Sequence, residues 1–214
     1  MFSFVFAQSL DVTFRYVENP NDDFVRVFVP GTMPSGTSND WGPNSNGMIS
    51  PNALSKMTYN QTTDSYEKTY SLNVGDEHLY KIHFHHNSSG SDYTWIPDPL
   101  NPLTTDDNWT NSILQVSDPL FFQIARHISA NGDVYGLSAG IFSSTGVDSI
   151  RYSTLADTLS GSEYYYDNGV LYIPFDSYLT VYDPIWVQAL INGEWNTVCN
   201  FGEIEIIQEP MPEG

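Results

Sequence analysis

Apolar residues recur at every second position in short stretches along the chain. A spacing of two puts alternate side chains on opposite faces of a β-strand, so each stretch is predicted to be a strand. No window of about 11 residues holds the 3.6-residue period of an amphipathic helix without Gly, Pro, Asn or Ser. The predicted strands are 11–17, 24–29, 65–72, 78–84, 112–116, 149–153, 170–175, 185–191 and 203–207.

Clusters of turn-forming residues separate these stretches, as in "NSSGSD" at 87–92, "ANGD" at 130–133 and "DNG" at 167–169. Many short strands joined by such turns are typical of antiparallel β-sandwiches. The sequence therefore predicts an all-β fold.

The strand pattern breaks within "VSDPLFF", residues 116–122, where a strand ends, a proline follows and a new aromatic run begins. We therefore expect two consecutive sandwiches, at 10–117 and 118–208. The Pro-rich run at 209–214 is interpreted as the start of a linker. Alternating inward positions predict that the second core contains Phe121, Ile141, Tyr172, Trp186 and Ile206.

The first nine residues, 1–9, begin with six apolar residues among seven and carry no basic residue. This run fits a truncated secretion signal, although a first core strand is the alternative. With the single cysteine, Cys199, there is no internal disulfide and no cysteine zinc site. We expect a secreted or periplasmic protein.

The charge balance limits the possible partners. Seven Lys and Arg stand against 26 Asp and Glu, a net charge of -19, which disfavours nucleic acid and anionic membranes. No stretch reaches the roughly 20 apolar residues of a membrane span. The expected ligand is neutral or cationic.

"GLSAG" at 136–140 fits the G-x-S-x-G nucleophile motif around Ser138. That motif needs a helix after the serine and a histidine later in the chain, but the segment that follows is not helical and the last histidine is His127. We interpret Ser138 as a small residue in a strand. No pair of carboxylates stands out among the 26, so no catalytic residue is predicted.

"HFHH" places His83 and His85 on one face of a strand and His86 on the other, so two imidazoles could share a metal ion. The spacing implies no third ligand, and solvent-facing polar residues are the favoured interpretation. The acidic pairs at 22–23 and 106–107 lack the spaced ligands of a calcium loop and are interpreted as solvated turns. No metal and no cofactor are expected.

Several segments of the first half resemble, in order, the carbohydrate-binding modules of family 48, which bind glycogen. These are "VRVFVPG" leading to "NDW", then "LYKI" at 79–82, "WIPDPLNP" at 95–102 and "NSILQV" at 111–116. The resemblance covers about residues 10–117. It implies an immunoglobulin-like β-sandwich with a site for an α-glucan such as starch or glycogen.

In that family two tryptophans form a flat platform for the sugar rings, and a lysine and an asparagine bind hydroxyl groups. The matching residues are Trp41, Trp95, Lys81 and Asn111. An indole can desolvate the C–H face of a glucose ring, which supports this assignment independently. Trp109 stands where the family often has a threonine, and we expect it to add a third ring.

The second half, 118–208, is similar to the immunoglobulin-like module that precedes the barrel of family 13 glycoside hydrolases, the α-amylase family. The resemblance implies a non-catalytic α-glucan-binding module and a spacer, forming the N-terminal part of a secreted amylase-type enzyme. The expected partners are an α-glucan poly- or oligosaccharide and a downstream catalytic domain. The alternative is a pair of structural domains that pack on a catalytic barrel without binding sugar.

Overall fold

The computed structural model describes residues 8–33, 41–42, 44–153, 164–175 and 185–200. All regular structure in these residues is β-strand, with antiparallel pairing throughout, and no helix in them is long and apolar enough to cross a membrane. The predicted all-β sandwich fold is confirmed. Residues 1–7, 203–207 and 209–214, with Ile206 of the predicted second core, lie outside the described residues.

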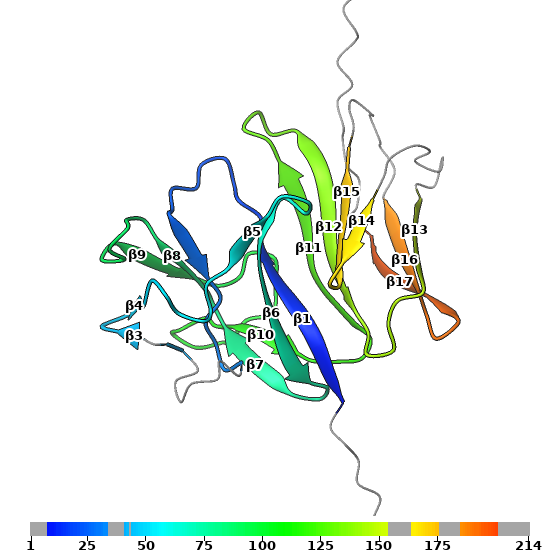
Figure 1. Ribbon diagram of the computed structural model, residues 1–214, viewed down its shortest axis with the longest axis horizontal. Helices are drawn as coiled ribbons and strands as arrows, with labels where there is room; N and C mark the ends of the chain where they lie inside the picture. Colours follow the sequence, from blue (N-terminus) through cyan, green and yellow to red (C-terminus); the bar gives the residue numbers. More distant parts are fainter. Residues whose placement is uncertain (1–7, 34–40, 43, 154–163, 176–184, 201–214) are drawn as a thin grey trace, which may run out of the picture.

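Ten strands precede the predicted boundary and lie together on one side of the molecule (Figure 1). They form the sheets β1-β6-β5, β2-β8-β9 and β10-β7 and the hairpin β3-β4. The strands are β1 (Ser9–Tyr16), β2 (Arg26–Phe28), β3 (Asn44–Ser45), β4 (Met48–Ile49), β5 (Thr58–Asn60), β6 (Ser65–Asn73), β7 (Glu77–Tyr80), β8 (Ile82–His85), β9 (Tyr93–Ile96) and β10 (Ser112–Gln115).

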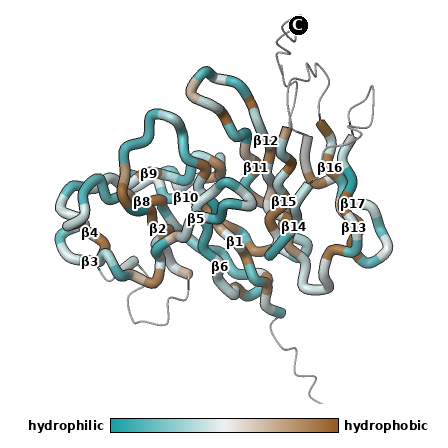
Figure 2. Tube along the Cα trace, turned by 45° about the horizontal axis from the view of Figure 1, so that its top comes forward, coloured by the Kyte–Doolittle hydropathy of each residue, from teal (hydrophilic) through white to brown (hydrophobic). Residues whose placement is uncertain are grey.

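The remaining strands form two further sheets, β11-β12-β15-β14 and β13-β16-β17. Figure 2 shows hydrophobic positions along the strands and mostly hydrophilic loops between them, as burial of one strand face requires. The strands are β11 (Leu120–Ile128), β12 (Val134–Phe142), β13 (Ser149–Ser153), β14 (Tyr165–Asp167), β15 (Val170–Pro174), β16 (Trp186–Ile191) and β17 (Glu194–Asn200).

The predicted strand 78–84 is two strands, β7 and β8, that belong to different sheets. The change occurs at Lys81, whose backbone N–H donates to the carbonyl of Pro30 at 3.1 Å. β7 pairs with β10, whereas β8 lies between β2 and β9. Lys81 is therefore fixed at the point where the chain crosses from one sheet to the other.

Of the three clusters of buried apolar side chains in the described residues, the two larger ones hold the sheets together. The larger contains Val12, Phe14 and Tyr80, and it also takes Leu120 and Phe122 from β11. The smaller lies between the two C-terminal sheets. Since the first cluster extends past residue 117, side chains from both halves stabilise the sheet around β1.

A buried polar layer crosses the same junction. The backbone N–H of Arg15 donates to Gln123 Oε1 at 2.7 Å, and Gln123 Nε2 donates to Asp98 at 2.6 Å. The hydroxyl of Tyr80 donates to the same carboxylate at 2.7 Å. Burial raises the pKa of Asp98 despite these bonds. Because buried polar groups need partners, this layer fixes β11 against the first half.

The predicted second core is right at Ile141 and at Phe121, which packs against the cluster from a partly buried position. It is wrong at Tyr172 and Trp186, which are absent from that cluster, whereas Leu171, Ile173 and Val187 fill it. Tyr172 lies instead against the ring of His127, with 4.9 Å between centroids. A one-residue error in register moves a side chain to the opposite face of the sheet.

Candidate functional site

The β3–β4 hairpin forms one wall of a cleft in the first half of the molecule. Its turn residues, Asn46 and Gly47, have φ of 52° and 87°, which is the geometry that an Asn-Gly turn favours. Their carbonyl oxygens accept hydrogen bonds from two side chains of β9: Tyr93 Oη at 2.8 Å and Trp95 Nε1 at 2.7 Å. A Cβ on residue 47 would lie 2.7 Å from the Tyr93 hydroxyl, so this close contact requires glycine.

Trp95 is half-buried, with one part of its ring against the protein and another part facing the cleft. It packs on a small apolar cluster of Phe28, Ile49 and Ala53, and its ring centroid lies 4.3 Å from that of His83. With its N–H bonded to Gly47, the indole has a fixed orientation. It offers an apolar face to a ligand rather than a hydrogen-bond donor.

Trp41 stands beside Trp95 at a ring-centroid distance of 6.5 Å and an interplanar angle of 50°. Both rings line the cleft. The two predicted rings are therefore adjacent, but they are tilted rather than coplanar. A rigid flat ligand cannot lie on both faces at once, whereas a ligand that bends between two rings can.

Trp109 is the most exposed aromatic side chain of the described residues that line the cleft, with 72% of its surface accessible. Its loop is held by Asp107, whose Oδ1 accepts from the backbone N–H groups of Trp109 and Thr110, each at 2.9 Å. A hydrogen bond from Thr105 is the main reason that the pKa of Asp107 is lowered. An apolar ring on an ordered turn is thus presented to solvent.

Lys81 and Asn111 complete the cleft, which encloses about 540 Å³. The backbone N–H of Asn111 donates to Thr105 Oγ1 at 2.9 Å, which ties it to the turn below Trp109. Both side chains are half-buried. The aromatic cleft, as we call it, is lined by Trp41, Asn44, Gly47, Leu79, Lys81, Tyr93, Trp95, Trp109 and Asn111.

All five residues of the sequence-derived site therefore lie around one cavity. Sequence reasoning missed the hairpin that supplies Asn44 and Gly47, although the Asn-Gly pair at 46–47 is a strong hairpin signal. It also missed Tyr93, which lies two residues before Trp95 and so shares its face of β9.

His83 and His85 are fully buried, so the favoured interpretation of solvent-facing residues is wrong. β8 is covered on both faces: Ile82 and Phe84 enter the main cluster, and the two imidazoles pack against Phe28 on the other side. Burial lowers the pKa of His83 to about 3, so it is neutral near pH 7.

The ring centroids of His83 and His85 are 5.1 Å apart. In the described part of the chain no group of three His, Cys, Asp or Glu side chains could hold a metal ion. His86, on the opposite face, bonds to Thr94 Oγ1 at 2.8 Å and to the carbonyl of Asp23. The three histidines are therefore packing residues of β8 and its edge, and among the described residues they are not joined by a third metal-ligating side chain.

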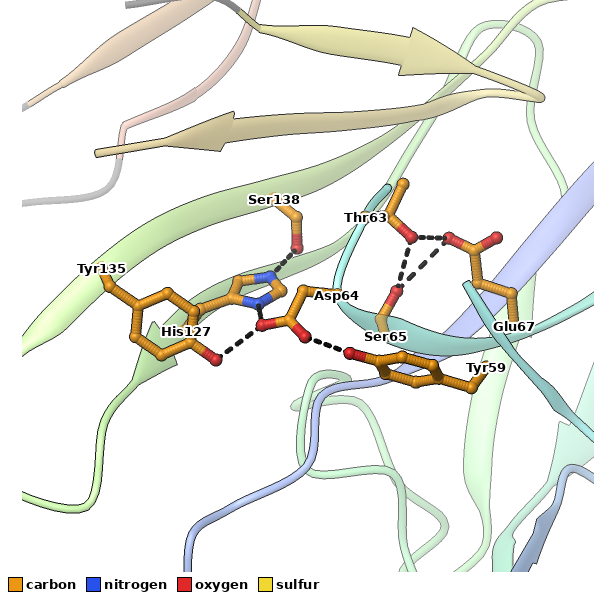
Figure 3. Close-up of polar contacts among 8 residues, drawn as sticks. All are labelled: Tyr59, Thr63, Asp64, Ser65, Glu67, His127, Tyr135 and Ser138. Atoms are coloured by element: carbon orange, nitrogen blue, oxygen red, sulfur yellow. Dashed lines mark hydrogen bonds and ion pairs between the residues drawn. The ribbon is translucent and has the colours of Figure 1, made fainter. Parts of the chain in front are cut away.

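A second group of chemically suggestive residues lies at the junction of the two halves (Figure 3). Ser138 Oγ is 3.0 Å from His127 Nε2, and His127 Nδ1 is 3.7 Å from Asp64 Oδ2. No histidine follows Ser138 in the chain, but His127 precedes it and lies on the neighbouring strand, while Ser138 itself is a small residue within β12 as interpreted from the sequence. Such groups are recognised by geometry and not by chain order.

This group is closed to substrates. Ser138 is 1% exposed and His127 is 0% exposed, and Ser138 lies in mid-strand with β11 and β15 paired on its two sides. The rings of Tyr135 and Tyr172 pack on the imidazole. Burial lowers the pKa of His127 to about 4. A nucleophile needs access and an oxyanion-binding site, so this arrangement supports packing rather than hydrolysis.

No family model, curated protein or solved structure matches this chain.

Proposed function

We propose that the protein is a non-catalytic module that binds α-glucan, such as starch or glycogen, in the aromatic cleft. The observation that carries this proposal is the meeting of Trp41, Trp95, Trp109, Lys81 and Asn111 around one cavity. The C–H face of a glucose ring loses little by leaving water for an indole face, and the surrounding polar groups select its orientation.

The tilt between the rings bears on the type of glucan. Successive residues of an α-linked glucan turn relative to one another, so neighbouring sugars present differently oriented faces. β-Linked cellulose is a flat ribbon and calls for coplanar rings. The 50° angle between Trp41 and Trp95 therefore favours a curved α-linked chain over a flat one.

Polar recognition falls to Lys81 and Asn111 at the edge of the cleft. A lysine ammonium group has three donors, and an asparagine amide donates and accepts, which suits vicinal sugar hydroxyls. Because a shallow site buries little surface and association carries an entropic cost, we expect dissociation constants roughly in the micromolar to millimolar range.

We further propose that the chain belongs to the N-terminal part of a secreted or periplasmic amylase-type glycoside hydrolase, with residues 118–208 as spacer. The alternative is that the N-terminal domains pack on a catalytic barrel and bind no sugar. One observation favours it: the N–H of Trp95 is already bonded to Gly47, and part of its ring packs on Phe28. Trp95 therefore has a structural role under either proposal. Trp109 is 72% exposed, so its substitution distinguishes a sugar-binding ring from a packing one.

Electrophoresis through glycogen-containing gels tests the proposal. Glycogen should retard the native protein, and Trp109→Ala should reduce the affinity at least about tenfold, with the melting temperature unchanged because the ring is exposed. Trp195→Ala is the matched control, since Trp195 is 40% exposed but lies on β17, outside the cleft. Unretarded native protein, or equal losses from both substitutions, would favour the packing role.

A further inference from the structure

A second cavity, of about 290 Å³, opens on the surface beside Asp64. Three segments far apart in sequence meet there: the loop after β1, the turn between β5 and β6, and the hairpin of β11 and β12. We call it the tyrosine pocket; its walls include Glu18, Tyr59, Asp64, Ile128 and Tyr135. It shares no lining residue with the aromatic cleft.

Two tyrosines present ring surface at this pocket while their hydroxyl groups are engaged. Tyr59 donates to Asp64 Oδ1 at 2.5 Å and Tyr135 donates to Asp64 Oδ2 at 2.7 Å (Figure 3). The two side chains remain 44% and 36% exposed. The pocket therefore offers aromatic ring surface rather than free hydroxyl donors. The face of such a ring carries partial negative charge.

The pocket also carries negative charge that its own walls do not balance. Burial opposes ionisation of Asp64 and raises its pKa. Hydrogen bonds donated by Tyr135 and Tyr59, and the electrostatic effect of nearby His127, outweigh burial and lower the pKa, so Asp64 is charged at neutral pH. Burial, with the nearby charges of Asp22 and Asp64, raises the pKa of Glu18. Among the residues that the structure describes, neither lysine nor arginine lines the pocket.

His127 does not supply the missing positive charge. It is fully buried behind Asp64, and its Nδ1, 3.7 Å from the carboxylate, has no hydrogen-bond partner among the described residues. Burial holds its pKa at about 4, so the ring is neutral at pH 7. An imidazole nitrogen therefore faces Asp64 without neutralising it.

We propose that the tyrosine pocket binds an organic cation, an alkylammonium or guanidinium group. Aromatic faces attract such cations, and adjacent carboxylates add to the attraction where little water intervenes. The cation can come from a free small molecule or from a lysine or arginine side chain of a peptide. A net charge of -19 assists its approach in either case.

Methyl NMR of the full chain tests this proposal, because Ile128 lines the pocket and is 37% exposed. Choline and N-acetylarginine amide are titrated separately, with sodium chloride at equal ionic strength as the blank. We expect a saturable shift of the Ile128 methyl signal with at least one probe, at concentrations on the order of millimolar. Preference for choline points to a small quaternary ammonium ligand, and preference for the arginine derivative points to a basic peptide.

Two pocket variants and one control sharpen the result. Asp64→Asn should raise the dissociation constant at least about fivefold, and Tyr59→Leu should weaken binding through loss of a ring even if the first variant folds poorly. Asp133→Asn removes the same charge from an exposed position outside the pocket lining and should change binding less than about twofold. Shifts that do not saturate, that sodium chloride reproduces, or that Asp64→Asn and Asp133→Asn alter equally would overturn the proposal.

Discussion

The aromatic cleft and the group formed by Asp64, His127 and Ser138 both contain residue types that mark functional sites, but they differ in access. In the cleft, Trp109 is 72% exposed, and it lines an open cavity together with the four other predicted site residues. In the junction group, His127 and Ser138 are at most 1% exposed and bond to each other. The first arrangement leaves surface for a ligand, whereas in the second the Ser138 hydroxyl and the His127 ring are closed to one.

This difference shows why residue type alone does not assign a role. A serine next to a histidine that is itself next to an aspartate suggests nucleophilic catalysis. A buried polar group, however, needs a hydrogen-bond partner for stability alone. A tryptophan on a loop suggests core packing, yet an exposed indole on an ordered turn carries a free-energy cost that a ligand can relieve. Access and partner satisfaction therefore decide between the two interpretations.

The largest effect is expected from Trp95→Ala, because Trp95 both faces the cleft and packs on the cluster of Phe28, Ile49 and Ala53. We expect a loss of about 3 kcal/mol in the free energy of unfolding together with loss of glycogen binding. Chemical denaturation and gel retardation measure the two effects. Unchanged stability would show that the ring lies wholly on the ligand side.

His127→Ala should separate the junction group from sugar binding. Removing the ring leaves a cavity and an unpartnered Ser138 hydroxyl, so we expect a loss of about 2 kcal/mol in unfolding free energy and unchanged glycogen affinity at temperatures where the protein is folded. Ser138→Ala should cost less, because it removes one hydroxyl group and little volume. A large loss of affinity with intact stability would contradict a packing role.

The pH dependence of stability follows from the lowered pKa of His127. The unfolded chain binds a proton near pH 6.5, whereas the folded chain holds the ring neutral down to about pH 4. Unfolding therefore takes up a proton between these values, and stability falls as pH decreases through this window, by about 2 kcal/mol between pH 7 and 5.

His127→Gln should make this dependence shallower, which denaturation midpoints at pH 5, 6 and 7 will show. The variant should retain part of the slope, because burial also lowers the pKa of His83, to about 3. An identical slope in the variant would mean that His127 is protonated in the folded protein as well.

The period of two predicted about half of the described strands, because a strand with one buried face must alternate, but it did not predict β11 or β12. It failed where both faces are covered: β8 buries His83 and His85 as well as Ile82 and Phe84, and alternation cannot tell which face meets solvent. It also failed at Tyr172, where the neighbouring Leu171 and Ile173 point into the core. Alternation gives the period of a strand, whereas the inward face depends on what packs against it.

The candidate site was predictable to the extent that a resemblance supplied it. Trp41, Lys81, Trp95, Trp109 and Asn111 were named from ordered short motifs, and their meeting in one cleft depends on the β3–β4 hairpin and the Asp107 turn. The contact between Asp64 and His127 was not predictable, because it joins a turn of the first half to a strand of the second. No local pattern encodes a contact between segments so far apart.

The most direct measurement is a maltoheptaose titration followed through the five indole N–H signals in a nitrogen-15 NMR spectrum of the whole chain. We expect saturable shifts for Trp41 and Trp109, a smaller one for Trp95, whose N–H is bonded to Gly47, and none for Trp186 and Trp195. Cellohexaose at the same concentration should shift them less. Unmoved signals for Trp41 and Trp109 at saturating maltoheptaose, or shifts confined to Trp186 and Trp195, would contradict α-glucan binding in the aromatic cleft.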